Sequence, residues 1–386
     1  MRIGLVYRHF NLTGSLQRYT VELARYLSRR DHEVHVFSIA STTLESLAPG
    51  CTFHPVPAKH VQQGVWSVRE LWSFASAAAR QVAREPLDVV HARLPSTWEA
   101  DVLHLAGVTR GEARRGGADT ARWRLAQARH PHNIVRPWLE RRAVRNPRVI
   151  RFHVDSTQVR EDLVRVHGVE RDRIRVVPPG VNTDEFRPAV DRASVRAALD
   201  LPRDRPLVLF CGHDFRRKGL DRALQALAAV ELPTLLMVVG GRAAELPEYE
   251  RLAAELAVAD HVRFIGPTTE AAAYFHAADV CVLPTRVDMW GTTAVEAMAS
   301  GVPPIVSEAA GSAEVIEDGV SGYVLSEPFE LDRFVMLLDR LLRSPELRAD
   351  LGRAGRARAV KLGWDRHGKL VEDDLVSVAA NRRVPR

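Results

Sequence analysis

The range 284–303 carries the densest set of side chains that suit a ligand-binding site. A predicted strand ends before it, Asp288 follows in a loop, and a helix is predicted to open at Thr292 and Thr293. The N–H groups and hydroxyls at such a helix start can hold phosphate oxygens. Glu296 lies within one turn of that start, where its carboxylate can accept hydrogen bonds from ribose hydroxyls. The stretch thus suits a phosphorylated, ribose-bearing ligand, although an isolated pair of acids eight residues apart is more often a pair of surface charges.

A second candidate segment follows the apolar run 207–211 and contains three adjacent cations, Arg216, Arg217 and Lys218. Cations at the carboxyl end of a strand suit a diphosphate, whose negative charge must be neutralised as it leaves. A bare basic triplet is usually a solvated turn. The position of this one, between a predicted strand and a predicted helix, favours phosphate binding.

A third candidate is the loop 7–16, which places Gly14 and Ser15 just before a predicted helix. A glycine at that point lets an anion approach the main chain. The alternative is an ordinary loop glycine followed by Ser15 as the N-cap of the helix. Because no G-x-G-x-x-G fingerprint follows the first predicted strand, a dinucleotide-dependent dehydrogenase is not expected.

The elements that must position these residues alternate along the chain between short apolar runs and longer stretches of helical periodicity. The predicted strands are 3–6, 33–39, 88–91, 101–105, 149–154, 207–211, 234–240, 262–266, 279–283, 304–306 and 323–325, and the predicted helices include 15–28, 65–84 and 293–300. This alternation predicts an α/β fold with two doubly wound parallel sheets, divided near 177–182, where two prolines and a glycine interrupt the pattern. Ligands of such sheets bind outside the carboxyl ends of the strands, so we expect the site in a cleft between the two domains.

The composition is that of a globular protein, since 46% of the 386 residues are hydrophobic and 26% are charged. No apolar run reaches the length of about 18 residues that would span a bilayer. The first residues show no basic leader followed by an apolar segment, so a soluble protein that is not exported is expected. Three widely spaced cysteines predict free thiols in a reducing cytoplasm.

The formal net charge of +6 is unevenly distributed. Between Arg110 and Arg151 the chain carries twelve arginines against three acids, interleaved with Trp123 and Trp138. Such a segment suits an anionic membrane surface, and we favour that reading. The alternatives are a solvated basic loop and a nucleic-acid-binding surface, for which no reader motif accompanies the charge.

In combination, the motifs resemble those of the retaining, two-domain glycosyltransferases of family 4, which have the GT-B fold and use a nucleotide sugar as donor. The family's acidic motif, E-x7-E followed by G-x-P, corresponds to Asp288, Glu296 and the segment 301–303. The Gly14 loop and the segments 179–182, 217–219 and 264–266 also fall in the family's order, so the resemblance covers nearly the whole chain. Within the family, the segments 14–18 and 214–222 are most similar to the lipopolysaccharide core glucosyltransferase I enzymes, which add glucose to an inner-core heptose.

The resemblance implies a role for each motif residue. Arg217 and Lys218 would bind the diphosphate, and Glu296 would hold the ribose. Asp288 would act as a catalytic residue close to the hydroxyls of the transferred sugar. Gly14 would contact the donor phosphate or sugar, and Ile265 would receive the base. Gly291, Thr292 and Thr293 would hold a second side of the diphosphate.

The family also places a histidine at the end of a strand of the N-terminal domain, near the anomeric carbon. His104 is predicted to end one strand and His91 the strand before it. A lone histidine at a strand end is more often structural, but the expected cleft favours His104 as a catalytic residue that hydrogen-bonds a sugar hydroxyl. No metal site is expected, because no D-x-D triplet occurs and no His/Asp cluster has the spacing of metal ligands.

Two departures from the family pattern bear on the pocket for the donor sugar. The first acid of the motif is Asp288, one methylene shorter than the usual glutamate, and Met289 with Trp290 replaces a glycine–aromatic pair. Retention without a carboxylate nucleophile fits attack on the face from which the diphosphate departs, with the leaving phosphate accepting the proton of the acceptor.

The resemblance therefore implies two Rossmann-like domains facing each other across a cleft: 1–178 for the acceptor and 179–364 for the nucleotide sugar, with a helix at 365–386 returning to the first. The expected enzyme is a metal-independent hexosyltransferase that moves glucose from UDP-glucose to a cell-envelope glycolipid such as the lipopolysaccharide inner core. It needs no cofactor besides the donor, and we expect it on the inner face of the cytoplasmic membrane. The alternatives are another family 4 transferase, with a different donor or a non-lipid acceptor, and a non-catalytic nucleotide-sugar-binding protein.

Overall fold

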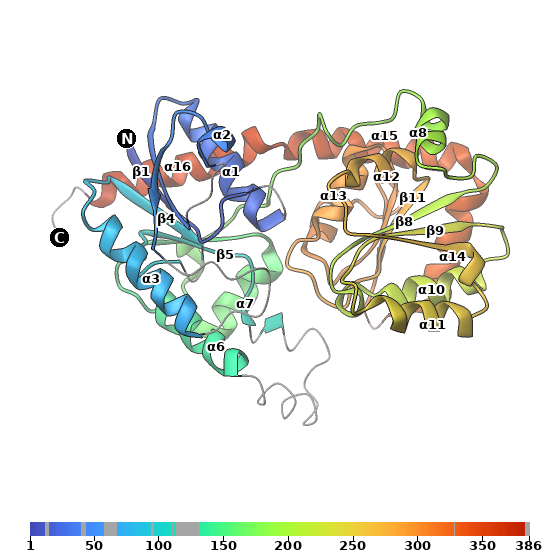
Figure 1. Cartoon of the computed structure of the whole chain (residues 1–386), viewed down its shortest axis with the longest axis horizontal. Coiled ribbons are helices and arrows are strands. Elements are labelled where there is room, and N and C mark those ends of the chain that lie inside the picture. The colour runs from blue at the N-terminus through green and yellow to red at the C-terminus, as the bar shows by residue number, and fades with distance from the viewer. Residues whose placement is uncertain are drawn as a thin grey trace. The chain divides into compact units, whose positions relative to one another are not determined.

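The computed structural model describes residues 1–11, 15–39, 44–57, 68–93, 96–109, 111–112, 131–327 and 329–382. The chain forms two compact units (Figure 1), of which unit 1 comprises Met1–Gly180 with Trp364–Arg386 and unit 2 comprises Val181–Gly363. Each unit is built on one parallel sheet, as the alternation of elements predicts. Among the described helices, none is long and apolar enough to cross a bilayer.

The sheet of unit 1 has seven strands in the order β3-β2-β1-β4-β5-β6-β7. The strands are β1 (Arg2–Val6), β2 (Glu33–Ser38), β3 (Thr52–Pro55), β4 (Val89–Arg93), β5 (Val102–Leu105), β6 (Arg151–Val154) and β7 (Ile174–Val176). The described helices are α1 (Ser15–Ser28), α2 (Leu44–Leu47), α3 (Val68–Val82), α6 (Pro131–Val144), α7 (Thr157–His167) and α16 (Trp364–Arg382). The sequence does not predict β3 and β7, because these short edge strands are mostly half-exposed and form no continuous apolar run.

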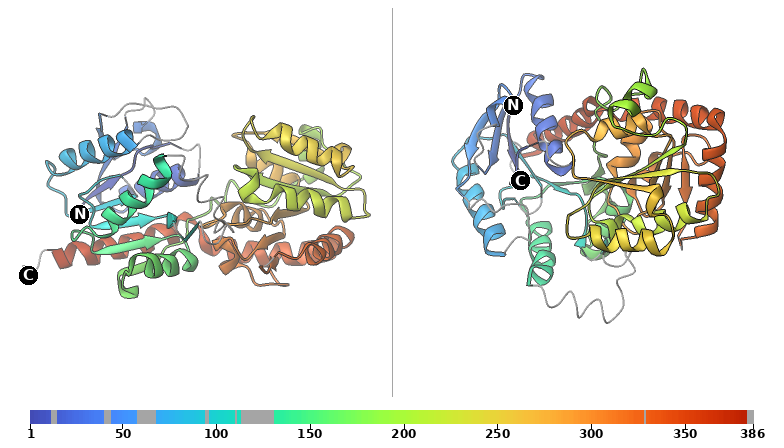
Figure 2. Two further views of the ribbon diagram at one scale, coloured as in Figure 1. Left: turned by 90° about the horizontal axis from the view of Figure 1, so that it is seen from below. Right: turned by 45° about the vertical axis from the view of Figure 1, so that its right-hand side comes forward.

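One face of this sheet is covered by α1 and α16 (Figures 1 and 2). Ile3 of β1, Leu23 of α1 and Val371 of α16 belong to one buried cluster. The two helices can approach closely because Gly368 has no side chain: a Cβ there would lie 2.3 Å from the ring of Tyr26. The last helix of the chain is therefore part of the core of unit 1.

The sheet of unit 2 has six strands in the order β10-β9-β8-β11-β12-β13. The strands are β8 (Leu207–Gly212), β9 (Leu235–Gly240), β10 (Val262–Gly266), β11 (Val280–Leu283), β12 (Pro304–Ser307) and β13 (Tyr323–Leu325). The α-helices are α8 (Arg192–Ala198), α9 (Phe215–Lys218), α10 (Leu220–Ala229), α11 (Leu246–Glu255), α12 (Ala271–Ala277), α13 (Thr292–Ala299), α14 (Leu331–Arg343) and α15 (Pro345–Ala359).

The central strands of unit 2 are apolar along their length because both faces of the sheet are buried. Leu209 and Met237 pack into the cluster that includes residues of α12, α13 and α15. Val208 and Phe210, one residue to either side of Leu209, pack into the opposite cluster with residues of α10, α11 and α14. Figure 1 shows these two sets of helices on the two sides of the sheet. This double burial confirms the doubly wound architecture.

In unit 2 the strand order reverses between β8 and β11, because later strands are added on both sides of β8. Such a switch point opens a crevice at the carboxyl ends of the two strands, where ligands of doubly wound sheets bind. The segments after β8 and β11 are the two that the sequence marks as candidates, namely 213–219 and 284–291.

Two histidines of unit 1 lie on strands and are buried. The sequence predicts His91 as the last residue of its strand, whereas β4 continues to Arg93. His104 lies one residue before the end of β5 at Leu105, where the predicted strand 101–105 also ends. The two residues are 3% and 0% exposed, which corrects the expectation that His104 is open to a ligand.

Candidate active site

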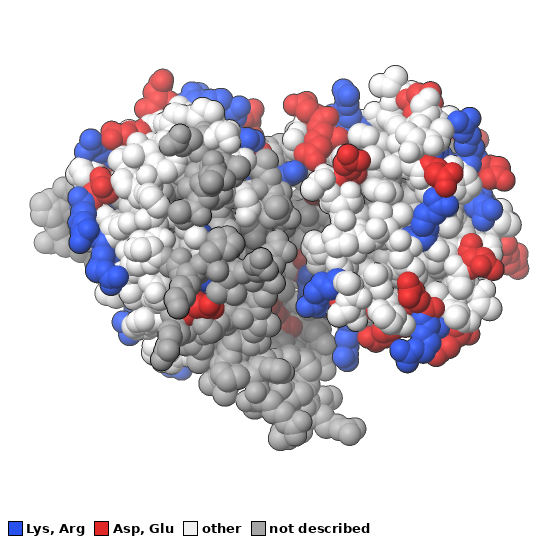
Figure 3. All heavy atoms as spheres, in the orientation of Figure 1, with Lys and Arg blue, Asp and Glu red and all other residues white. Residues whose placement is uncertain are grey.

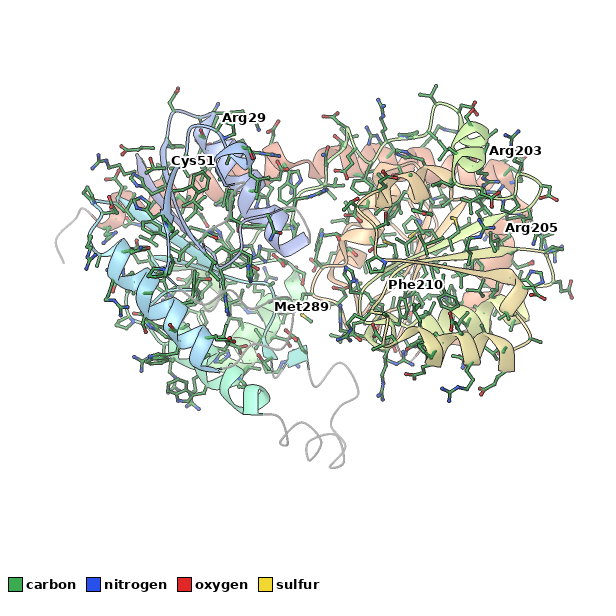
Figure 4. All side chains as sticks on the ribbon, in the orientation of Figure 1. Arg29, Cys51, Arg203, Arg205, Phe210 and Met289 are labelled. Carbon is green, nitrogen blue, oxygen red and sulfur yellow. The ribbon has the colours of Figure 1, made fainter. Side chains whose placement is uncertain are left out.

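The segment after β8 forms a single helical turn, α9, held at both ends by residues in the left-handed region. Asp214, with φ of 61°, caps the turn, and its carboxylate accepts a hydrogen bond from the backbone N–H of Arg217 at 3.3 Å. Gly219 ends the turn with φ of 78°. Phe215 anchors it from below, since its ring is fully buried 6.0 Å from that of Phe210, which Figure 4 labels in unit 2.

The segment after β11 is bonded to this turn through the backbone. The N–H of Arg286 and the hydroxyl of Thr285 both donate to the carbonyl of Arg217, at 2.9 and 2.8 Å. Gly219 permits the contact, since a Cβ at that position would lie 2.0 Å from the carbonyl oxygen of Pro284. The two segments that the sequence marks separately therefore form one structure.

At their junction, Asp288 meets the two cations predicted to bind a diphosphate. The ammonium of Lys218 donates to the Asp288 carboxylate, and the guanidinium of Arg217 lies 3.7 Å from the same oxygen. Lys218 is 8% exposed and Asp288 is 9% exposed. Burial by itself raises the pKa of Asp288, but the two cations outweigh it and hold this pKa below its ordinary value.

The start of α13 lies beside the end of β8. Gly291, with φ of 84°, precedes the helix, and the hydroxyl of Thr293 donates to the carbonyl of Cys211 at 3.1 Å. Burial, together with the charge of Glu296, raises the pKa of the Cys211 thiol to about 12. Glu296 is half-buried on this helix and Thr292 precedes Thr293 at its first turn, so the predicted helix-start residues reach the same strand end as Lys218.

Two further predicted donor residues lie elsewhere in the chain. Ile265 is half-buried near the end of β10, with β9 between its strand and β8, and Gly266 follows it with φ of 79°. This places it on the carboxyl edge of the same sheet. Gly14 lies outside the described residues, as does the core of the Arg110–Arg151 segment.

Sequence reasoning missed the residues that support the site. Arg286 makes a two-pronged ion pair with Asp221 of α10, at 2.8 and 2.6 Å, and so fixes the start of the segment that holds Asp288. No spacing rule points to this pair, because its members are 65 residues apart. Met289, labelled in Figure 4, lies in the same segment beside Asp288.

His104 does not face solvent. One ring nitrogen lies 2.6 Å from Asp155 Oδ1 and the other 2.9 Å from the hydroxyl of Tyr19, and all three residues belong to unit 1. With both nitrogens engaged and no exposed surface, the ring offers no group to a sugar in this arrangement. The sequence predicts that the His104 ring is accessible to a ligand, and the structure shows instead that it is buried.

Comparisons with known proteins show the family of this chain. The family model described as "Glycosyltransferase Family 4" matches residues 16–185, and the model "Glycosyl transferases group 1" matches residues 191–358. A curated relative from Xylanimonas cellulosilytica, named D-inositol 3-phosphate glycosyltransferase, is 31% identical and covers 96% of this chain and 93% of its own. The chain belongs to the group 1, family 4 glycosyltransferases.

Solved structures place this glycosyltransferase in the GT-B fold. WaaG, described as a glycosyltransferase involved in lipopolysaccharide biosynthesis, superposes with a TM-score of 0.75 at 22% identity, covering 97% of this chain and 99% of its own. The Anabaena protein HepE, crystallised with UDP-glucose, also gives a TM-score of 0.75 at 16% identity, covering 98% and 100%. At these identities the likeness shows the fold alone. The narrower resemblance to lipopolysaccharide glucosyltransferases is therefore not shown.

Within the glycosyltransferase, the crevice of unit 2 combines groups suited to one chemical task. Two cations and the start of α13 meet at the carboxyl ends of β8 and β11, and half-buried positive charge attracts a diphosphate more strongly than charge in water does. In the described part of unit 2, no three His, Cys, Asp or Glu residues are arranged to bind a metal ion. The positive side chains here are of the kind that stabilises a departing diphosphate.

Proposed function

We propose that the enzyme transfers a hexose from a UDP-linked sugar to a phosphorylated polyol acceptor, with retention and without a catalytic metal. The observation that carries this proposal is the junction of Lys218, Arg217 and Asp288 at the switch point of unit 2. Lys218 donates to the Asp288 carboxylate and Arg217 lies 3.7 Å from the same oxygen, so an incoming diphosphate can replace the carboxylate beside both cations.

In this mechanism Lys218 and Arg217 neutralise the diphosphate as the bond to the anomeric carbon breaks. Asp288 then exchanges Lys218 for a hydroxyl of the transferred sugar and fixes the orientation of the ring. The departing phosphate oxygen accepts the proton of the attacking hydroxyl on the same face. Glu296 holds the ribose through its carboxylate, and the backbone at Ile265 receives the base. Gly291, Thr292 and Thr293 complete the donor site around the phosphates.

The choice of a UDP-linked hexose is supported by the fold shared with HepE, whose structure contains UDP-glucose. The shorter Asp288 and the adjacent Met289 set the pocket for the sugar, so the hexose is proposed by class. Hydrogen bonds in the site discriminate between sugars that differ in one hydroxyl, so turnover of a panel of donors identifies the hexose.

The acceptor we favour is an inositol phosphate, because relatives that are 31–32% identical over 91–96% of this chain are named D-inositol 3-phosphate glycosyltransferases. The lipopolysaccharide inner core is the second candidate, supported by the likeness to WaaG. Both acceptors present hydroxyls beside a phosphate, and unit 1 is the proposed acceptor domain.

A surface of unit 1 supports the proposed contact with an anionic membrane. Trp72 of α3 and Trp138 of α6 are 38% and 51% exposed, and their rings are 5.9 Å apart. The guanidinium of Arg142 lies between 5.1 and 5.9 Å from the centroids of Trp72, Trp98 and Trp138. Exposed tryptophans beside an arginine suit the headgroup level of a bilayer. On the face of unit 2 that Figure 3 shows, charges of both signs are interspersed.

For His104 we propose a positioning role instead of contact with the sugar. Its two hydrogen bonds join Tyr19 of α1 to Asp155, the residue that follows β6. A positioning role predicts that His104→Gln changes the affinity for acceptor and leaves donor hydrolysis nearly unchanged. A catalytic contact would instead lower both.

The test is a panel of UDP-, GDP-, ADP- and TDP-hexoses, each offered with D-inositol 3-phosphate or with an inner-core glycolipid in the presence of a chelator. We expect turnover of one UDP-hexose. Glu296→Gln should lower it about 100-fold, the effect of losing a hydrogen bond to a charged group. Glu255→Gln, which changes an exposed glutamate at the end of α11 in the same unit, should retain it.

Other outcomes correct the proposal in defined ways. Turnover with another nucleotide overturns the UDP donor, and loss of activity in the chelator overturns metal independence. Nucleotide binding without transfer to either acceptor indicates a non-catalytic nucleotide-sugar-binding protein. Donor hydrolysis without transfer leaves the donor site in place and rejects both acceptors.

A further inference from the structure

A second polar cluster lies inside unit 1, apart from the proposed donor-binding residues of unit 2. His91, His104 and His153 come from the adjacent strands β4, β5 and β6. Each offers one ring nitrogen, and the three nitrogens lie within 4.8 Å of one another. The side chains share one face of the sheet, because His104 pairs in register with His153 and with Arg93, two residues after His91. All three side chains are buried.

Two of these rings carry a nitrogen that the protein leaves without a hydrogen-bond partner. His91 Nε2 and His153 Nδ1 are buried and have no partner among the described residues. Buried polar atoms are nearly always paired with protein, water or an ion, because an unpaired one loses its hydration without compensation. Two such atoms in one cluster therefore call for an occupant that can pair with both.

Two of the three rings are oriented by carboxylates. His153 Nε2 lies 3.0 Å from Asp374 Oδ2, and His104 Nε2 lies 2.6 Å from Asp155 Oδ1. A carboxylate only accepts, so both Nε2 atoms carry the proton. His153 Nδ1 then presents a lone pair, and His104 Nδ1 accepts the hydrogen bond of the Tyr19 hydroxyl at 2.9 Å. In protein metal sites, a histidine ligand typically donates its second N–H to a carboxylate in this way.

The electrostatic setting keeps the rings neutral. Burial is the main cause that lowers the pKa values of His91, His104 and His153. The neighbouring guanidinium of Arg93 lies 3.8 Å from Asp155 and 4.2 Å from the centre of the Tyr19 ring, so its charge is partly balanced. Three neutral imidazoles are ligands that Zn²⁺, Co²⁺ and related ions prefer.

We propose that His91, His104 and His153 form a binding site for a divalent transition metal such as Zn²⁺, which ties β4, β5 and β6 together. The hydroxyl of Tyr19 lies 2.9 Å from His104 Nδ1 and has to move aside for that nitrogen to bind the ion. The site is structural and lies in a different unit from the crevice of Lys218. Metal content can therefore be measured separately from donor binding.

The test measures the metal content of the full-length protein after refolding with Zn²⁺ and dialysis against a weak chelator. We expect about one zinc per chain in the wild type and at least a tenfold loss in His91→Asn and in His153→Asn. The matched control is His54→Asn. His54 belongs to a second group, with His35 and Glu85. In that group His54 Nε2 and His35 Nδ1 already bond each other at 2.9 Å.

Cobalt gives a readout that does not require the variants to fold. Co²⁺ bound by histidine nitrogens in four-coordinate geometry absorbs strongly in the visible range, and the wild type refolded with Co²⁺ should show these bands. A folded wild type that retains neither zinc nor cobalt overturns the proposal and leaves a buried water as the occupant. Metal that is lost in His54→Asn but retained in His91→Asn also overturns it, because the ion then belongs to the second group.

Discussion

Asp288 and Lys218 form a contact whose role changes between the resting enzyme and the proposed donor complex. At rest, the carboxylate satisfies an ammonium that is only 8% exposed and that would otherwise lack a counter-ion. A buried cation without a partner is costly, so Asp288 stabilises unit 2 before any ligand arrives. When a diphosphate binds, it can replace the carboxylate, which frees Asp288 for the sugar. One pair thus serves both stability and donor binding.

Replacing Lys218 with methionine tests the cationic half of this pair. We expect kcat to fall about 100-fold, because a lost charge-assisted contact to the diphosphate is worth about 1.5–3 kcal/mol. The control is Lys361→Met, which removes an exposed lysine of the same unit. Initial rates and calorimetric binding of nucleoside diphosphate give the result, and equal rates in both variants would remove Lys218 from the donor site.

Replacing Asp288 with asparagine tests the anionic half. The side chain keeps its shape but loses the charge that opposes an incoming phosphate, so free nucleoside diphosphate should bind roughly tenfold tighter, a change of about 1.4 kcal/mol. Transfer should nevertheless slow, because the proposed partner of the sugar hydroxyl is weakened. Titration calorimetry beside initial rates separates these effects, and weaker nucleotide binding would contradict the exchange.

At the scale of elements, the single turn α9 and the segment after β11 depend on each other. The turn is too short to be stable by its own hydrogen bonds. It is held by the cap of Asp214, by the buried ring of Phe215 and by the bonds that the next segment makes to the carbonyl of Arg217. A change in the fit between the two segments therefore moves the cations away from Asp288.

Substituting Gly219 by alanine tests this fit. The residue has φ of 78°, and a Cβ would lie 2.0 Å from the Pro284 carbonyl oxygen. We expect a loss of stability of about 1–3 kcal/mol and a lower kcat, measured by denaturant unfolding and initial rates. Gly319→Ala is the matched control, since its φ is 75° but nothing lies within 4 Å of the added Cβ. Equal losses of stability in both variants would show that the positive φ, and not the contact with Pro284, causes the effect.

The helix α16 gives a prediction on pH at the same scale. His367 is buried, and burial lowers its pKa to about 4 while its ring bonds the carbonyl of Pro178 at 2.8 Å. The unfolded chain binds a proton near pH 6.5, so stability is intact above that pH and falls between pH 6.5 and about 4. The loss by pH 4 should be roughly 3 kcal/mol.

Denaturant unfolding of the wild type and of His367→Gln across this range checks the result. The variant should lose less stability than the wild type as the pH falls, since glutamine does not titrate. Parallel curves for the two proteins would show that His367 is not a source of the acid sensitivity.

At the scale of the whole molecule, the chain crosses between units twice, and this fixes which parts can fold alone. Unit 2 is continuous in sequence from Val181 to Gly363, whereas unit 1 needs the final helix. Val371, Leu375 and Val378 of α16 are buried in the core of unit 1. A chain without them leaves an apolar face of the sheet uncovered.

Truncation tests this division. A chain of residues 1–363 should lose the fold of unit 1 and aggregate, because burial of one such apolar side chain contributes about 1.5–3 kcal/mol and several are lost together. The fragment 181–363 should remain folded. Circular dichroism and limited proteolysis of the two products give the answer, and a protease-resistant unit 1 in the truncated chain would contradict it.

The sequence by itself determined the local features. Apolar runs separated by helical periodicity are sufficient to predict two parallel sheets, because a strand buried on both faces must be apolar along its length. The order of motifs likewise predicted that the segments holding Lys218 and Asp288 follow strands. Such features depend on residues within one or two turns of each other, and the chain records them directly.

The tertiary structure alone decided which distant residues meet. Lys218 and Asp288 are 70 residues apart, and they pair because β8 and β11 are neighbours in the sheet. His91, His104 and His153 are separated by 13 and 49 residues, a spacing that predicts no site, yet adjacent strands bring them to one face. The physical reason is that strand order and the direction of each side chain arise from packing of the whole unit, and no local pattern encodes them.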